Sequence, residues 1–242
     1  VTLTTLFFGL GMFLGGKAAD KFGRKKLYLL FYILLIVSLI PPAFLGNSKN
    51  VVYFLMAFQF FVGAVNPIFN AMVADLTTNK ERKAAFSLLY LGWNIGFALG
   101  PTIAGFLFNN YLPLLFLGDA ITALIALFLI AFNVPETKEI AEAKSKDDLS
   151  ELEQAESGSL LSVLVKRPGI VLLSCLIMFY RFVYAQSSFS LPLQMNQIFG
   201  EQGPSYFGIN MSFNAVVVII FTVVITSVTK KLKPLDNIII AG

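Results

Sequence analysis

Residues 84–118, AAFSLLYLGWNIGFALGPTIAGFLFNNYLPLLFLG, contain no charged side chain. A helix that crosses the roughly 30 Å hydrocarbon core of a bilayer needs about 20 apolar residues. The stretch is therefore too long for one crossing, and the turn-forming residues Asn-Asn-Tyr-Leu-Pro at 109–113 divide it. The sequence therefore predicts two membrane helices here, over 84–108 and 112–134.

Similar apolar stretches recur along the chain. They cover 1–16, 27–45 (closed by Pro41, Pro42 and the turn Gly-Asn-Ser at 46–48), 51–74, 169–191 and 206–228, and a further one begins at 238–242. In lipid the backbone must satisfy its own hydrogen bonds, and these stretches exceed the length of barrel strands. We predict an all-α polytopic membrane protein with seven spans and the start of an eighth. Because both ends lie in apolar runs, we expect a partial chain, truncated at both ends.

Composition supports a membrane protein and excludes several kinds of site. The chain is 57% hydrophobic and 13% charged, and its 25 Phe outnumber its 14 carboxylates, so an aqueous surface is hard to build. It has no His and one cysteine, Cys175, which excludes an internal disulfide and argues against zinc or haem sites. We find no nucleophile–base set, so we expect no enzyme, no catalytic residue, no metal and no cofactor.

Positive charge gathers in alternate loops. Sixteen of the 18 Lys and Arg residues lie within 17–26, 75–83, 135–168 and 229–233, whereas the opposite loops hold only Lys49. The positive-inside rule therefore predicts that the basic loops are cytoplasmic. The net charge of +4 is explained by this topology, so we expect no nucleic-acid partner.

The turn GGKAADKFGRKKL at 15–27 is the most specific motif in the chain. It resembles the G-x-x-x-D-x-x-G-R-K/R loop signature of the major facilitator superfamily, and the matching positions are Gly16, Asp20, Gly23, Arg24 and Lys25. Glycine allows close approach at position 16 and a turn at 23, while Asp20 and Arg24 can pair or bond elsewhere. The resemblance implies a latch between two halves of a transporter that favours the outward-open state. An ordinary basic turn is the alternative.

The resemblance also implies a division of the chain. It would run from the family's second helix to its eighth, as part of a two-bundle transporter. The divisions are an N-terminal bundle that lacks its first helix (1–134), a cytoplasmic central linker (135–168) and the start of a C-terminal bundle (169–242). Val-Pro-Glu-Thr at 134–137 resembles the ending after the family's sixth helix, and Asp75 with Glu-Arg-Lys-Ala at 81–84 resembles the turn after its fourth. Members take a small-molecule substrate and a coupling ion, here expected to be a proton, and we expect a monomer.

The segment GWNIGFALGPTIAG at 92–105 bears on direction. Gly92, Gly96, Gly100 and Ala104 recur every four residues, so they share a helix face that permits close packing, and Pro101 should bend the helix. Gly96, Gly100, Pro101 and Gly105 resemble the family's antiporter signature, which implies export; a plain packing interface is the alternative. The pattern is closest to bacterial drug:proton antiporters. Their proton-relay arginine, however, is replaced here by Gln59.

Polar residues within the spans are candidates for substrate or coupling chemistry. Arg181 lies near mid-membrane, where a charge is costly, and fits an anion-binding group or a counter-ion. Asp119 lies nearer the outer end of its helix and has either a titrating or a structural role. The other candidates are Tyr184, Gln59, Asn66, Asn94 and Asn214. Each can bond between helices or face a central cavity.

Three functions follow from these observations. The leading hypothesis is proton-driven export of small amphiphilic molecules by alternating access across a membrane, expected to be a bacterial plasma membrane. The second is a proton-coupled importer of a small solute such as a sugar or peptide. The third is a membrane scaffold without a transport cycle.

Overall fold

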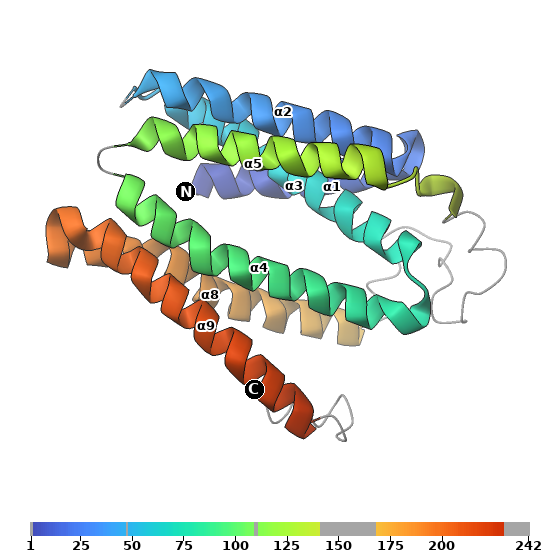
Figure 1. The fold of residues 1–242 in the computed structure, drawn as a ribbon. Coiled ribbons are helices and arrows are strands. Elements are labelled where there is room, and N and C mark those ends of the chain that lie inside the picture. Colours follow the sequence, from blue (N-terminus) through green and yellow to red (C-terminus); the bar gives the residue numbers. More distant parts are fainter. Residues whose placement is uncertain (1, 47, 109–110, 141–167, 230–242) are drawn as a thin grey trace. The chain divides into compact units, whose positions relative to one another are not determined.

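A computed structural model describes residues 2–46, 48–108, 111–140 and 168–229 (Figure 1). The α-helices in those ranges are α1 (Thr2–Phe22), α2 (Arg24–Leu45), α3 (Val51–Leu76), α4 (Asn79–Leu107), α5 (Leu112–Asn133), α8 (Pro168–Phe199) and α9 (Gly203–Thr229). The described residues contain no strand, so the all-α prediction is confirmed. Most of the predicted linker and the start of the eighth span lie outside the described residues.

The helices follow the predicted spans, and some extend beyond them: α1 continues past residue 16 to Phe22, and α4 begins at Asn79 instead of near 84. The uncharged stretch divides as expected, because α4 ends at Leu107 and α5 begins at Leu112. Helix α2 ends at Leu45, before the predicted turn, and it includes both Pro41 and Pro42. Neighbouring groups in a membrane bundle can satisfy the backbone carbonyls that a proline leaves free. Likewise α8 continues through Pro192 to Phe199 instead of ending near residue 191.

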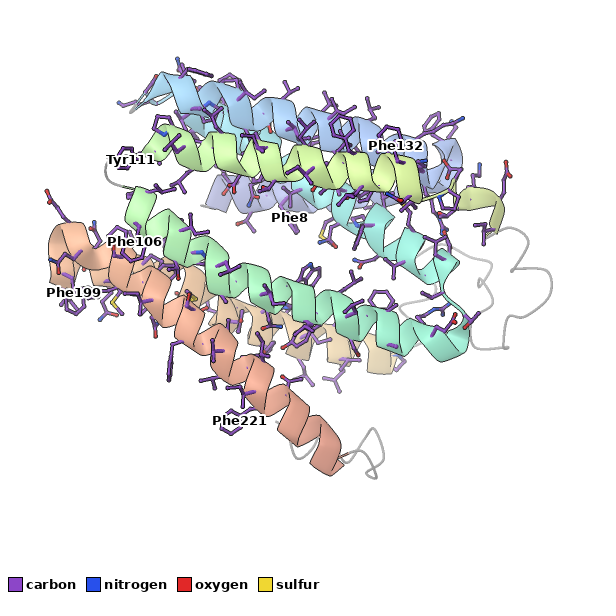
Figure 2. The ribbon with its side chains drawn as sticks, in the orientation of Figure 1. Phe8, Phe106, Tyr111, Phe132, Phe199 and Phe221 are labelled. Carbon is purple, nitrogen blue, oxygen red and sulfur yellow. The ribbon has the colours of Figure 1, made fainter. Side chains whose placement is uncertain are left out.

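The helices suit a bilayer. Five segments of the described chain are long and apolar enough to cross a membrane, and the apolar part of α1, Leu3–Ala19, is shorter. Figure 2 shows large apolar side chains along the helices, among them Phe132, Phe106 and Phe221, which are 82%, 62% and 56% exposed. Soluble proteins rarely expose apolar surface on this scale. The chain is therefore a multi-pass integral membrane protein.

The chain forms two compact units. The first unit comprises Val1–Arg82 and Tyr111–Leu193, and the second comprises Lys83–Asn110 and Gln194–Gly242. In the first unit α3 packs against α1 and α2, and α2 packs against α5, which lies beside it in Figure 1. The core has two clusters of buried side chains. One contains Ala19, Tyr28, Val65, Ile68 and Met72, and the other Leu35, Ile36, Leu39, Ala120 and Leu127.

Glycines bring α1 and α3 into backbone contact, and we call this contact the α1–α3 seam. A methyl group added at Gly11 would overlap the Phe60 carbonyl, and one at Gly15 would overlap the Ala64 backbone. From the other helix, a methyl group at Gly63 would overlap the carbonyl of Phe8, whose side chain is labelled in Figure 2. Without a hydrophobic driving force in lipid, such close approach provides the dispersion contacts that hold membrane helices together.

In the second unit, α4 and α9 meet along small and hydroxylated residues, which we call the α4–α9 seam. Thr102 donates to the Gly208 carbonyl at 3.0 Å, and Ser205 donates to the Gly105 carbonyl at 3.1 Å. Ser212 donates to the Ala98 carbonyl, and its hydroxyl lies against that of Thr102. Gly105 and Gly208 leave no room for a side chain between the two backbones. Hydrogen bonds from hydroxyl side chains commonly stabilise contacts between helices in lipid.

Candidate functional site

The signature turn, the end of α3 and the exit of α5 meet at one end of the first unit, and we call their polar residues the turn cluster. Gly23 joins α1 to α2 with a φ of 99°, a left-handed conformation that favours glycine. Its backbone N–H bonds the Ala19 carbonyl at 3.2 Å, which ends α1. The direction of the chain therefore reverses at the place where the motif has its glycine.

Arg24 connects α2 to α3. Its guanidinium Nη1 forms an ion pair with Asp75 Oδ2, and the two side chains are only 17% and 10% exposed. A nearly buried arginine needs such a partner, because an unpaired charge is costly to keep away from water. The sequence left open whether Arg24 pairs with Asp20 or bonds elsewhere, and the structure shows the bond to Asp75. The side chain of Asp20 lies outside the description, so its role stays a prediction.

Glu136 caps the beginning of α2. Its Oε1 accepts the backbone N–H of Arg24 at 2.8 Å and of Lys25 at 3.1 Å, and its Oε2 accepts that of Lys26 at 3.3 Å. A carboxylate there satisfies free N–H groups and faces the positive end of the helix dipole. Partial burial alone would raise the pKa of Glu136. Backbone hydrogen bonds from Lys25, Arg24, Lys138 and Lys26 outweigh it, so the pKa lies below its ordinary value.

The exit of α5 is fixed at two further points. The N–H groups of Thr137 and Lys138 also point at Glu136 Oε1, at 3.0 and 3.3 Å, so the loop wraps around the carboxylate. The Lys138 ammonium then donates to the Lys21 carbonyl near the end of α1, at 3.2 Å. The Pro-Glu-Thr ending was identified from the sequence, but no role was assigned to Glu136. The sequence feature that could have indicated a role is an acidic residue just after a span, on the side where the loops are basic.

Two predicted glycine contacts differ from the structure. The nearest atom to a methyl group at Gly16 would be Pro67 Cβ at 4.0 Å, so the close approach expected of Gly16 is made by Gly15 instead. On α4, methyl groups at Gly92, Gly96 and Gly100 would meet no described atom within 4 Å. The tight contact on that helix lies at Gly105, and the Pro101 carbonyl packs against Gly208. Helix α4 also runs unbroken through Pro101.

A stripe of carboxamides runs along α3. Gln59, Asn66 and Asn70 are separated by seven and four residues, so they share one helix face, and all three are half-buried. Asn70 Nδ2 donates to Asn66 Oδ1 at 2.9 Å, although Pro67 lies between them in an unbroken helix. Val65 and Ile68, on other faces of α3, are buried against the core. Gly63 of the α1–α3 seam lies on the same face, so the stripe runs along the edge of that helix contact.

The remaining candidates lie on four different helices. Arg181 and Tyr184 are exposed on α8, and the Tyr184 ring stacks on that of Tyr180 at 6.1 Å. Asn94 Nδ2 donates to the Tyr90 carbonyl of its own helix at 2.8 Å. Asp119 and Asn214 are exposed on α5 and α9. The described residues hold no group of three or more acidic, Cys or His side chains suited to a metal ion.

A family model described as Major Facilitator Superfamily matches residues 1–242, the whole chain. The chain belongs to the major facilitator superfamily. The turn cluster is thus built on a loop of this superfamily's helical framework, and a fragment from within the family accounts for the number and length of the helices.

The names of relatives in the superfamily state different functions. Over 129 residues the chain is 35% identical to Multidrug resistance protein 2 of Bacillus subtilis, an alignment that covers 52% of this chain and 32% of that protein. It is 27% identical to a Na(+), Li(+), K(+)/H(+) antiporter of Planococcus maritimus over 88% of this chain and 55% of that protein. The chain thus spans between a third and just over half of the length of these relatives.

A solved structure has the same fold. A crystal structure of a POT family transporter in complex with 5-aminolevulinic acid aligns with a TM-score of 0.58 and 18% identity. The alignment covers 96% of this chain and 61% of that one. At this identity the likeness concerns the arrangement of the helices alone.

Proposed function

We propose that the complete protein is a secondary transporter that uses an ion gradient, with a proton as the coupling ion, to export small amphiphilic molecules. The observation that carries this proposal is the turn cluster on a superfamily framework of apolar helices. Export is supported by the antiporter-like residues Gly96, Gly100, Pro101 and Gly105, and by the drug-resistance and antiporter names of two relatives. The mechanism is alternating access, in which two bundles rock about a central site.

The orientation is part of the proposal. The turn at 17–26, the end of α3 and the exit of α5 come together at one end of the first unit, since Arg24 contacts both Asp75 and Glu136. These are segments in which the sequence gathers Lys and Arg residues. The positive-inside rule favours the cytoplasm for that end. The turn cluster is then a cytoplasmic latch, with Gly16, Asp20, Gly23, Arg24 and Lys25 as its motif residues.

Substrate contacts are proposed on the polar sides of the helices. The carboxamide stripe that includes Gln59 and Asn66 offers hydrogen bonds without charge, which suits amphiphilic cargo. Arg181 and Tyr184 of α8, Asn94 of α4 and Asn214 of α9 are the further candidates. For coupling, Asp119 is the carboxylate candidate within a described span, because the chain has no histidine and Gln59 replaces the relay arginine.

A transport assay separates the candidate functions. The complete protein is reconstituted in vesicles with an imposed proton gradient, and the movement of a fluorescent cationic dye is followed. Export predicts dye movement against its gradient that stops with a proton ionophore. Gradient-dependent uptake of a sugar or dipeptide, with no dye movement, would instead favour the importer, and indifference of every solute to the gradient would refute both.

A variant separates the transporter from the scaffold. Asp20→Asn neutralises the motif carboxylate, and we expect the initial transport rate to fall at unchanged membrane abundance. Glu139→Gln removes the same charge from an exposed position near the cluster and serves as the control. Equal rates in wild type and the Asp20 variant would contradict a latch at this turn.

A further inference from the structure

Five backbone N–H groups surround a single carboxylate at the turn cluster. Three belong to the first turn of α2 and two to the loop after α5, so Glu136 joins segments more than 100 residues apart in sequence. We propose that Glu136 is a positioning residue that holds Arg24 in place for Asp75 and fixes the beginning of the central linker to the signature turn. The functional part of this inference rests on the transport activity proposed above.

The argument begins with Arg24, which is held at both of its ends. Its backbone N–H donates to Glu136 Oε1 at 2.8 Å, and its guanidinium bonds Asp75 on α3. Arg24 is the first residue of α2, where the N–H groups have no partner within the helix. The N-cap residue of α2 is Gly23, which has no side chain that could accept these N–H groups. The carboxylate supplied from the α5 exit therefore decides where the backbone of Arg24 lies and how its guanidinium reaches Asp75.

The neighbouring backbone leaves room for the carboxylate. A Cβ added at Gly23 would lie 3.1 Å from Glu136 Oε2, closer than an ordinary contact, and its φ of 99° already disfavours other residues. Glycine at this motif position thus has two roles, to turn the chain and to admit the carboxylate. The Lys138 ammonium on the Lys21 carbonyl adds a second attachment between the same two segments.

A mechanical consequence follows from the position of Glu136 in the chain. It lies three residues beyond the last residue of α5 and precedes the segment predicted to link the two bundles. A pull on that linker therefore acts on the Lys138–Lys21 contact and then on the bonds of Glu136. Through them it acts on the start of α2 and on the Arg24–Asp75 pair. The linker would then influence the latch directly and not only tether the bundles.

Hydrogen exchange tests the contact without reference to transport. In the complete protein in detergent, Glu136→Ala removes the acceptor and Glu136→Gln removes only the charge, while Glu139→Gln is the matched control. We expect exchange at the amides of 24–26 to accelerate about fivefold in the alanine variant, as for a lost helix cap. A smaller acceleration is expected in the glutamine variant and none in the control. Equal exchange in all four proteins would overturn the proposal, and the glutamine variant keeps the test valid if the alanine variant does not fold.

A double-mutant cycle tests whether Glu136 acts through Arg24. Initial transport rates are measured for Glu136→Gln, Asp75→Asn and the double variant, at matched membrane abundance. Residues that act on one shared group are not independent, so the double variant should lose less than the product of the two single losses. A loss equal to that product would mean that Glu136 does not position Arg24. If wild type itself moves no substrate, the proposed function fails while the exchange result still decides the contact.

Discussion

The α1–α3 seam allows a sharp prediction, because adjacent glycines of one helix differ in their surroundings. A methyl group at Gly15 would lie 2.6 Å from the Ala64 Cα, whereas one at Gly16 would lie 4.0 Å from its nearest neighbour, Pro67 Cβ. We therefore predict opposite effects of Gly15→Ala and Gly16→Ala on stability. Both substitutions gain roughly 1 kcal/mol of helix propensity, so this gain cancels when the two variants are compared.

The magnitude follows from the overlap. Carbon atoms in contact prefer roughly 3.5–4.0 Å, so the backbones of α1 and α3 must separate by about 1 Å to admit the Gly15 methyl group. A gap of that size forfeits about a quarter to a half of each dispersion contact along the seam. Overpacking of this kind costs about 1–3 kcal/mol, and the obstacle here is backbone, which cannot swing aside as a flexible side chain can. Gly15→Ala should be less stable than Gly16→Ala by about this amount.

The free energy of unfolding in mixed micelles, followed by circular dichroism during titration with a denaturing detergent, measures the difference. A second pair within α1 repeats the comparison: Gly11→Ala meets the Phe60 backbone, whereas Gly9→Ala meets nothing within 4 Å. If the two members of each pair agree within about 0.5 kcal/mol, the usual limit of such comparisons, the reasoning about the seam is refuted.

Three further predictions concern the polar contacts. Asp75→Asn should lower the free energy of unfolding by about 1–3 kcal/mol. This is somewhat below the cost of breaking a fully buried ion pair, because the Arg24 side chain is 17% exposed. An unchanged free energy of unfolding in the detergent titration would argue against the ion pair. Thr102→Val should lower the free energy of unfolding by about 0.6 kcal/mol or more, because it loses the hydrogen bond to α9. Thr122→Val should lower it less in the same titration, because the Thr122 hydroxyl bonds carbonyls of its own helix. Because the pKa of Glu136 is lowered in the folded state, its cap is complete above the ordinary pKa of a glutamate and is lost as the pH falls through the lower folded value. Amide exchange at 24–26, corrected for intrinsic rate, should therefore rise only below that ordinary pKa, and a step that persists in Glu136→Gln would contradict this assignment.

The sequence was sufficient for those features of the fold that depend on local composition. The division of the uncharged stretch into α4 and α5 needed only the length of a bilayer crossing and the turn residues near 109–113. The end of α8 was less predictable. The span was expected to end near residue 191, but the helix continues through Pro192 to Phe199, because proline is tolerated in a bundle that satisfies the freed carbonyls.

The candidate site was predictable only in part, because its contacts are tertiary. Spacing established that Gly92, Gly96 and Gly100 share a face, but not whether a neighbour lies against it. The contact at Gly105 depends on Pro204 of α9, about 100 residues away in sequence. Gly15 and Gly16 point in directions about 100° apart on α1, so the packing of α3 decides which of them is tight. The motif identified Arg24, but its partners Asp75 and Glu136 lie 51 and 112 residues away.

The α4–α9 seam has a consequence for how the polypeptide tolerates being cut. Helix α4 precedes the long acidic segment and α9 follows it, yet the bonds from Thr102, Ser205 and Ser212 join the two helices directly. None of these bonds needs an intact chain between residues 141 and 167. A protease nick in that segment, or expression of the two sides as separate polypeptides, would leave the complementary surfaces of α4 and α9 unaltered, so the two pieces retain the means to recognise each other and reassemble.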